Sequence, residues 1–207
     1  MKLVSTDGRE KTIIRGAAAT APDAKGMGTD AVRCVHLFGS GSIFGFTLAD
    51  GRTKTDDNGY GYGGGVSAAA NGTAVDCFIT NCVAKRGGAF YGGKTSSLVN
   101  SVVVDCNSAS PGSGVYNASV WGCLFMNMAG RPLYSTHARN CSALVGEIAG
   151  SSGSSLARTW NSYLMTDGGN NVFSNCYSTL ATAGANSDWS DPRNRRQLDL
   201  YTQFAFD

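Results

Sequence analysis

One short stretch of the sequence gathers residue types that bind cations and sugars. Residues 51–65 read GRTKTDDNGYGYGGG, which places Asp56 and Asp57 close to Tyr60 and Tyr62. Carboxylate oxygens are preferred ligands of Ca²⁺, and a pair of carboxylates can cleave a glycosidic bond by acid–base chemistry. Aromatic rings add apolar faces on which sugar rings can lie. These four residues are therefore the predicted ligand-binding set, with calcium as one ligand they could hold. The alternative is an ordinary solvated Asp-Asp turn.

The rest of the sequence does not complete a catalytic or metal-binding site. His36 and His137 are its only histidines, and Cys77 and Cys82 have four residues between them, not the two of a common zinc motif. His36 alternates with apolar neighbours and is expected to pack or to face solvent. The sequence also has no P-loop and no nucleophile elbow between a strand and a helix. We therefore predict no catalytic residue, no metal and no cofactor; enzymatic activity stays open, and its absence is favoured.

The elements that would position this loop repeat along the chain. Three columns of similar residues recur at steps of 18–25 residues. The small column is Gly45, Cys77, Ser101, Cys123 and Cys141; the polar column is Asn81, Asp105 and Asn127; the apolar column is Val66, Phe90, Val115 and Leu133. Repetition at this period is the signature of a solenoid. The step from Gly45 to Cys77 is 32 residues long, so residues 51–65 form an insertion, and insertions commonly build binding surfaces.

The composition of the repeats indicates which solenoid this is. Their apolar runs are short, rich in Val, Ile, Phe and Thr, and bounded by Gly, Ser, Asn and Asp, as is typical of strands separated by turns. No copy carries helical periodicity. We predict an all-β, single-domain, right-handed parallel β-helix of about eight or nine turns over residues 1–176, with residues 177–207 as a C-terminal cap or irregular extension of the same domain.

In such a coil, rungs stack at roughly 4.8 Å, so equivalent side chains of neighbouring turns touch. The seven cysteines should then lie mostly inward as small apolar side chains with free thiols. Only the pairs Cys82–Cys106 and Cys123–Cys141 occupy matching positions that would suit disulfides. The polar column should form a ladder of hydrogen-bonded side chains at one turn.

A tyrosine follows three members of the apolar column, at Tyr91, Tyr116 and Tyr134. Stacked tyrosines would form a ridge along the coil. An exposed ridge would bind the apolar faces of sugar rings, whereas a buried one is core with its hydroxyls bonded to turns. We favour packing in the core or at the edge of a groove.

Two motifs in one repeat resemble those of a known family. The sequence FITN, from Phe78 to Asn81, followed by GGAF, from Gly87 to Phe90, resembles the paired motifs of polymorphic outer membrane protein repeats. Those repeats belong to the pectin-lyase-like superfamily of right-handed parallel β-helices. Residues 34–51, CVHLFGSGSIFGFTLADG, are similar to a rung common in bacterial surface proteins of that superfamily. The resemblance covers roughly residues 10–145, and only the copy at 77–91 keeps both motifs.

The resemblance implies a β-helix of a bacterial surface protein, but this fold carries several functions. Its lyases hold calcium on outward acidic residues, and its hydrolases use carboxylates on neighbouring rungs. The Gly-His-Gly and Arg-Ile-Lys signatures of polygalacturonases are missing from this sequence.

Three functions therefore stay open. The favoured one is a non-catalytic module for adhesion or glycan binding. The alternatives are a polysaccharide lyase or glycoside hydrolase acting on an acidic polysaccharide, and a purely structural stalk or assembly segment.

Composition and charge bear on partners and location. The net charge is +2 and 15% of residues are charged, without a basic stripe for nucleic acid. No apolar run is long enough for a transmembrane helix, and the first residues lack the apolar segment of a signal peptide. We expect a piece of a longer secreted or cell-surface protein, with a polysaccharide or surface glycan as its partner.

Overall fold

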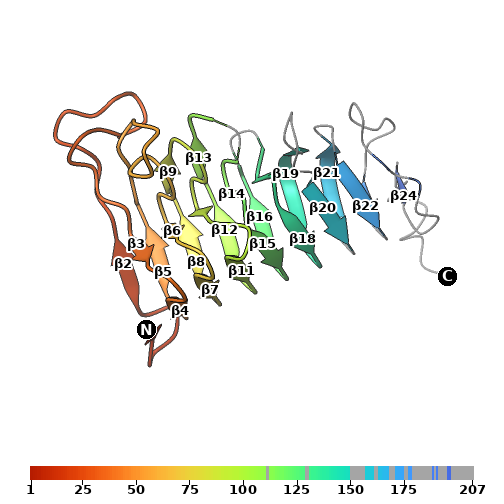
Figure 1. Cartoon of the computed structure of the whole chain (residues 1–207), viewed down its shortest axis with the longest axis horizontal. Coiled ribbons are helices and arrows are strands. Elements are labelled where there is room, and N and C mark those ends of the chain that lie inside the picture. Colours follow the sequence, from red (N-terminus) through yellow and green to blue (C-terminus); the bar gives the residue numbers. More distant parts are fainter. Residues whose placement is uncertain are drawn as a thin grey trace.

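The computed structural model describes residues 1–110, 112–128 and 131–149, the later strands at 157–160, 163–167, 171–174, 177–178 and 195–196, and residues 188 and 190. Side chains are described as far as Cys141 and again at 188 and 190. The described residues contain no helix. Their short strands follow one another along the long axis of the molecule, from the N-terminal end toward the C-terminal end (Figure 1).

One complete turn of the coil consists of four short strands joined by turns. An example comprises β7 (Thr73–Val75), β8 (Phe78–Thr80), β9 (Val83–Ala84) and β10 (Phe90–Tyr91). The next turn repeats them as β11 (Ser97–Val99), β12 (Val102–Val104), β13 (Asn107–Ser108) and β14 (Val115–Tyr116). Each strand pairs in parallel with its counterpart one turn later, for example Thr73 with Ser97 and Phe78 with Val102. This arrangement confirms the predicted parallel β-helix.

The strands form two long sheets and one short one. The first sheet has the order β1 (Lys2–Val4), β4 (Ser42–Phe44), β7, β11, β15 (Ser119–Trp121), β18 (His137–Arg139), β20 (Ala157–Trp160) and β22 (Asn171–Ser174). The second begins with β2 (Ile13–Arg15), β5 (Thr47–Ala49), β8, β12, β16 (Leu124–Met126) and β19 (Ser142–Ala149), and it returns from β19 through β17 (Leu133–Tyr134), β14, β10, β6 (Val66–Ala68) and β3 (Val35–Leu37). Strands β9 and β13 form the short third sheet.

Three further strands extend the second sheet beyond β19. They are β21 (Tyr163–Asp167), β23 (Tyr177–Ser178) and β24 (Arg195–Arg196), all paired in parallel. Two of them lie within the segment 177–207 for which a cap was predicted. The rest of that segment, apart from residues 188 and 190, lies outside the described residues, and so do parts of the predicted eight or nine turns.

The core consists of columns of side chains, because alternate residues of each strand point inward. The inward residues of successive strands are fully buried and pair in register with one another; they are the central residues of most strands and the first residues on the returning branch. In the first sheet they are Ile43, Ala74, Leu98, Val120 and Ala138; in the second they are Leu48, Ile79, Val103 and Phe125, and on its returning branch Val66, Phe90, Val115 and Leu133. The apolar column read from the sequence is therefore part of the core.

Each turn bends twice at a residue with left-handed backbone. One bend has Gly45, Asp76, Asn100, Gly122 and Asn140 in equivalent positions, and the other has Asp50, Asn81, Asp105 and Asn127, all with positive φ. Asn, Asp and Gly are the residues that adopt this conformation at least cost, which explains the polar column. At Gly122 a Cβ would lie 2.5 Å from Oδ1 of Asn100, so the side chain of Asn100 would have to move to admit a larger residue.

The polar column forms side-chain pairs on the outside of the coil. Asn81 donates from Nδ2 to Oδ1 of Asp50 over 2.7 Å, and Asn127 donates to Asp105 in the same way. Arg15 bonds to the other carboxylate oxygen of Asp50. Because Asn alternates with Asp, no two carboxylates are direct neighbours in this ladder, which avoids repulsion between stacked charges.

The residue after each bend points inward, and most cysteines occupy these positions. Five of them are at most 2% exposed: Cys77, Cys82, Cys106, Cys123 and Cys141. Their thiols donate to backbone carbonyls, and none of the six described cysteines, half-buried Cys34 included, forms a disulfide. Burial raises the pKa of Cys77, as expected for a thiol among apolar neighbours. The predicted inward position of the cysteines is thus confirmed for these five.

Candidate functional site

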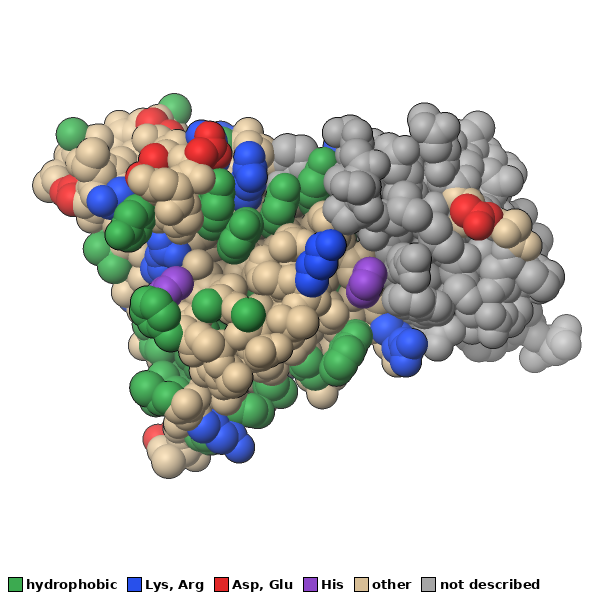
Figure 2. Space-filling view, in the orientation of Figure 1, with side chains coloured by type: hydrophobic (Ala, Val, Ile, Leu, Met, Phe, Trp, Pro, Cys, Tyr) green, Lys and Arg blue, Asp and Glu red, His purple; other side chains and the backbone are tan. Residues whose placement is uncertain are grey.

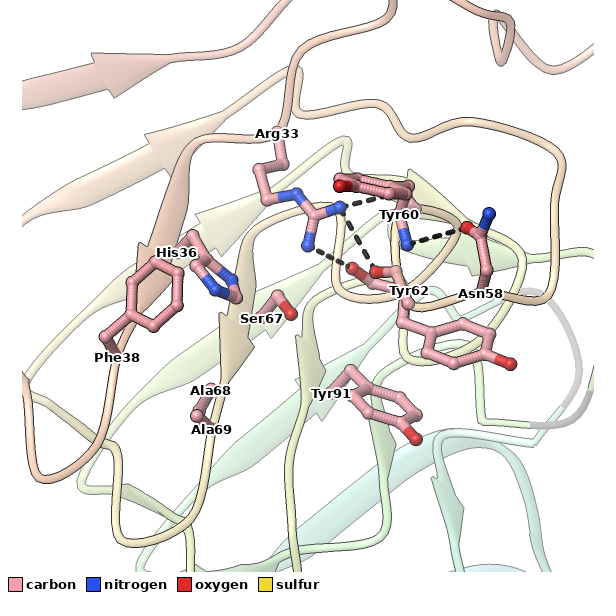
Figure 3. A pocket seen from close by; sticks show the side chains of 11 residues that line it. Arg33, His36, Phe38, Asn58, Tyr60, Tyr62, Ser67, Ala68, Ala69 and Tyr91 are labelled. Atoms are coloured by element: carbon pink, nitrogen blue, oxygen red, sulfur yellow. Dashed lines mark hydrogen bonds between the residues drawn. The ribbon is translucent and has the colours of Figure 1, made fainter.

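A groove of about 610 Å³ opens on the outer surface between strands β3 and β6 and the inserted loop. Figure 3 shows His36 and Phe38 on one side, with Tyr60, Asn58 and Tyr62 on the other. The remaining lining residues are Arg33, Gly59, Ser67, Ala68, Ala69 and Tyr91. Strands of the coil thus supply one wall, and the insertion predicted to bind ligand supplies the opposite wall.

Arg33 holds the inserted loop in this position. Its Nη1 donates to the carbonyl of Tyr62 over 2.8 Å, and its Nη2 donates to the carbonyls of Tyr60 over 2.7 Å and of Gly59 over 3.3 Å (Figure 3). The planar guanidinium suits this fork of acceptors. Burial lowers the pKa of Arg33, and the charge of Asp56 acts in the opposite direction. Arg33 could not be recognised from the sequence, because a single arginine before a strand carries no recognisable pattern.

The two ends of the insertion are anchored in the body of the coil. Thr53 is 1% exposed, and its hydroxyl donates to the carbonyl of Gly61 over 3.1 Å. The carbonyl of Thr53 accepts from the amide of Gly28, and the amide of Lys85 donates to the carbonyl of Gly61 over 2.8 Å. Residues 55–60 therefore project between two fixed points.

The four predicted ligand-binding residues divide into two pairs. Tyr60 and Tyr62 line the groove, whereas Asp56 and Asp57 are not among its lining residues. Asp57 forms ion pairs with Lys85 over 2.7 Å and with Arg86 over 3.6 Å. The hydrogen bond from Lys85 is the main reason that the pKa of Asp57 lies below its usual value. The structure thus places Asp57 where it ties the loop to the next turn of the coil.

The walls of the groove carry exposed aromatic rings. Phe38 is 80% exposed and Tyr60 is 59% exposed. The ring of Phe38 meets His36 edge to face, with 4.3 Å between the ring centroids. Burial, followed by the charge of Arg33, lowers the pKa of His36, so the imidazole is neutral at pH 7 and offers one donor and one acceptor. His36 is exposed, which is one of the two outcomes that the sequence left open.

Ser67 supplies a hydroxyl between the walls. It pairs with His36 across β3 and β6 and with Tyr91 across β6 and β10. Ser67 as a whole is only 6% exposed, but its hydroxyl oxygen is not fully enclosed. Among the described residues, no side chain or backbone group forms a hydrogen bond with this hydroxyl. The groove therefore contains a polar group that remains available to a ligand. No sequence motif marked Ser67.

Four tyrosines stack in a row that begins at the groove, and we call them the tyrosine ladder. Tyr91, Tyr116 and Tyr134 have centroid separations of 5.5 and 5.2 Å, which confirms the predicted stacking. Tyr62 extends the row from the inserted loop, 4.5 Å from Tyr91. Tyr62 belongs to no repeat column, so its place in the stack could not be predicted from the sequence.

The described residues contain no cluster of three or more His, Cys, Asp or Glu side chains placed to share a metal ion. Nor does this part of the chain form an apolar helix of membrane-spanning length. In comparisons with protein-family models, curated proteins and solved structures, nothing matches the chain.

Proposed function

We propose that the protein is a non-catalytic β-helix module that binds a glycan in the groove between Phe38 and the inserted loop. The observation that carries this proposal is the content of the groove. It combines the exposed rings of Phe38 and Tyr60 with the available hydroxyl of Ser67 and the neutral imidazole of His36. Sugars have apolar faces and hydroxyl groups at their edges, and this set of side chains suits both.

The carboxylates favour binding over catalysis. A lyase or hydrolase of the kind considered from the sequence would need a carboxylate or a calcium ion next to the sugar. Asp56 and Asp57 are not lining residues, and Asp57 is engaged by Lys85 and Arg86. A bound calcium ion at Asp57 would have to displace these cations, so calcium is a weaker candidate than a sugar.

The location of the protein is also a proposal. The resemblance of residues 78–81 and 87–90 to polymorphic outer membrane protein repeats, within the pectin-lyase-like superfamily, supports a secreted or cell-surface module of a bacterial protein. An adhesive role would follow if the glycan belongs to another cell.

A glycan array compared between three proteins tests the function. The wild type should bind at least one glycan class, and the double variant Phe38→Ala, Tyr60→Ala should lose at least tenfold in affinity, because both substitutions remove exposed rings. Trp121→Ala is the matched control, since Trp121 is 50% exposed but lies on the first sheet outside the groove. Equal binding by the double variant and the wild type, or cleavage of the bound glycan, would refute the proposal.

A further inference from the structure

We propose that the binding surface continues from the groove along Tyr91, Tyr116 and Tyr134, and that it holds an extended β-linked polysaccharide parallel to the axis of the coil. This inference rests on the proposed function and specifies its substrate class. The groove alone would suit the end of a glycan or a short sugar. The tyrosine ladder adds a surface for several consecutive sugars within a longer chain.

The hydroxyl groups of the ladder carry the argument. Tyr62 donates its hydroxyl to the carbonyl of Asp57 over 2.6 Å. The hydroxyls of Tyr91, Tyr116 and Tyr134 form no hydrogen bond with any described residue. They are also absent from the buried polar atoms that lack a partner, so their oxygens are not enclosed. The three hydroxyls therefore reach solvent. The row therefore differs from the buried alternative, in which turns would bond the hydroxyls.

The stacking determines what the ladder presents to a ligand. Neighbouring rings are nearly parallel, with interplanar angles of 13° and 22° along Tyr91, Tyr116 and Tyr134. Their faces cover one another, so the outer edge of the row, where the hydroxyls stand, is left for a partner. The ladder thus offers regularly spaced hydrogen-bonding groups. Stacking of sugars on aromatic faces is confined to the groove.

The spacing of the row selects an extended chain. The ring centroids are 5.5 and 5.2 Å apart, because the rungs of a parallel sheet fix the repeat. A bound peptide strand would present side chains on one face only every roughly 6.6–6.8 Å. This interval is longer than the spacing of the tyrosines, so successive peptide side chains would fall out of register with successive hydroxyls. An extended chain of β-linked hexoses advances by about one ring length per sugar, so each sugar meets one hydroxyl.

The groove and the ladder form one continuous surface, because Tyr91 lines the groove and also begins the free row of hydroxyls. Figure 2 shows hydrophobic side chains in a row along the described part of this face, with basic side chains beside them. Arg86 flanks the row, with its guanidinium carbon 5.3 Å from the ring centre of Tyr62 and 5.6 Å from that of Tyr116. Its remaining N–H groups can donate to sugar hydroxyls.

Chain-length dependence tests the inference. Calorimetry would measure binding of oligomers of two, four and six sugars from four β-1,4-linked series: glucose, N-acetylglucosamine, xylose and mannose. At least one series should gain roughly tenfold or more in affinity from two to six sugars. The α-1,4-linked glucose series is the geometric control, since its curved chain cannot follow a straight row and should show no such gain.

The double variant Tyr116→Phe, Tyr134→Phe keeps the stacked rings and removes two hydroxyls. Six-sugar binding should weaken roughly tenfold, as expected for two hydrogen bonds of modest net strength, while two-sugar binding stays unchanged. Ser119→Ala, which removes a partly exposed hydroxyl on the first sheet, is the control.

Affinity that does not depend on length, wild-type binding by the Phe variant, or no binding in any β-linked series would overturn the inference. Binding of other glycans that depends on Phe38 and Tyr60 would still support the proposed function. The two proposals can therefore fail separately.

Discussion

Substituting Arg33 by Met should weaken ligand binding without unfolding the coil. Arg33 is the residue whose guanidinium donates to three carbonyls of the inserted loop, those of Gly59, Tyr60 and Tyr62. Met keeps much of the side chain's length and apolar stem but cannot donate. We therefore expect the loop to leave its position opposite Phe38, while the stacked columns of the core, which Arg33 does not enter, stay intact.

The magnitude follows from these contacts. Hydrogen bonds from a charged donor contribute about 1.5–3 kcal/mol each. The bonds at 2.7 and 2.8 Å are well formed, and the one at 3.3 Å is long. Water replaces the guanidinium at the partly or fully exposed Gly59 and Tyr60, so we expect a net loss of about 1–3 kcal/mol in the stability of the closed loop. Since the apparent Kd rises as the competent fraction falls, ligand affinity should drop by roughly tenfold.

Three measurements check this prediction. Calorimetry with an array-identified glycan should show the loss of affinity, and hydrogen exchange should accelerate at the amides of residues 55–62. The melting temperature should change by less than about 4 °C, because the perturbation is local. Arg33→Lys is the matched variant: it keeps the charge but cannot span three carbonyls, so it should behave like the Met variant. Wild-type affinity in the Met variant, or a large drop in melting temperature, would show that the loop is held by something else.

Two further predictions concern the insertion and the polar ladder. Replacing residues 55–60 by two glycines should abolish glycan binding and leave the melting temperature within about 4 °C, because the buried anchors Thr53 and Gly61 remain; a collapse of the fold would contradict the view of this segment as a projection. Asn81→Asp should cost about 1–2 kcal/mol at pH 7 in urea unfolding, since it places a carboxylate directly between Asp50 and Asp105. Repulsion raises the folded-state pKa of the new group, so the loss exists above its unfolded pKa near 4 and disappears as the pH falls below it. A pH-independent loss would point to packing instead.

The fold could be predicted from the sequence because a stacked coil repeats its own constraints. Each inward position is filled by similar side chains in successive turns, so the columns of Val66 and of Cys77 are visible as spaced letters. The left-handed bends demand Asn, Asp or Gly, which made the column of Asn81 visible as well. Local chemistry and the global fold agree at these positions, and a single sequence is enough to show it.

The groove could be predicted only in part. The insertion was recognised because it lengthened one repeat step, and two of its four predicted residues line the groove. The role of Asp57 was not predictable, because its partners Lys85 and Arg86 belong to the next turn of the coil and have no fixed spacing from it. Arg33 and Phe38 lie outside the repeat columns, so periodicity says nothing about them.

Two segments of the N-terminal part pack by the same physical rule: the inserted loop and the segment that contains Cys34. Ser67 interrupts the tyrosine column, and Tyr62 from the inserted loop completes the stack beside it. Gly51 interrupts the cysteine column that continues at Cys82. A Cβ at Gly51 would overlap the carbonyl oxygen of Gly64 and lie 2.9 Å from the sulfur of Cys34, so the backbone and the Cys34 thiol together occupy that space. Contact with the Cys82 thiol, together with burial, raises the pKa of Cys34. In both cases a small residue breaks a column, and a side chain of the column's own type returns from elsewhere in the chain to fill it. A small residue that interrupts a column of a β-helix, with a matching side chain in a nearby insertion, therefore predicts where that insertion packs. In this chain the rule places Tyr62 on Tyr91, and this contact, together with the hydrogen bonds from Arg33, holds the inserted loop at the edge of the groove.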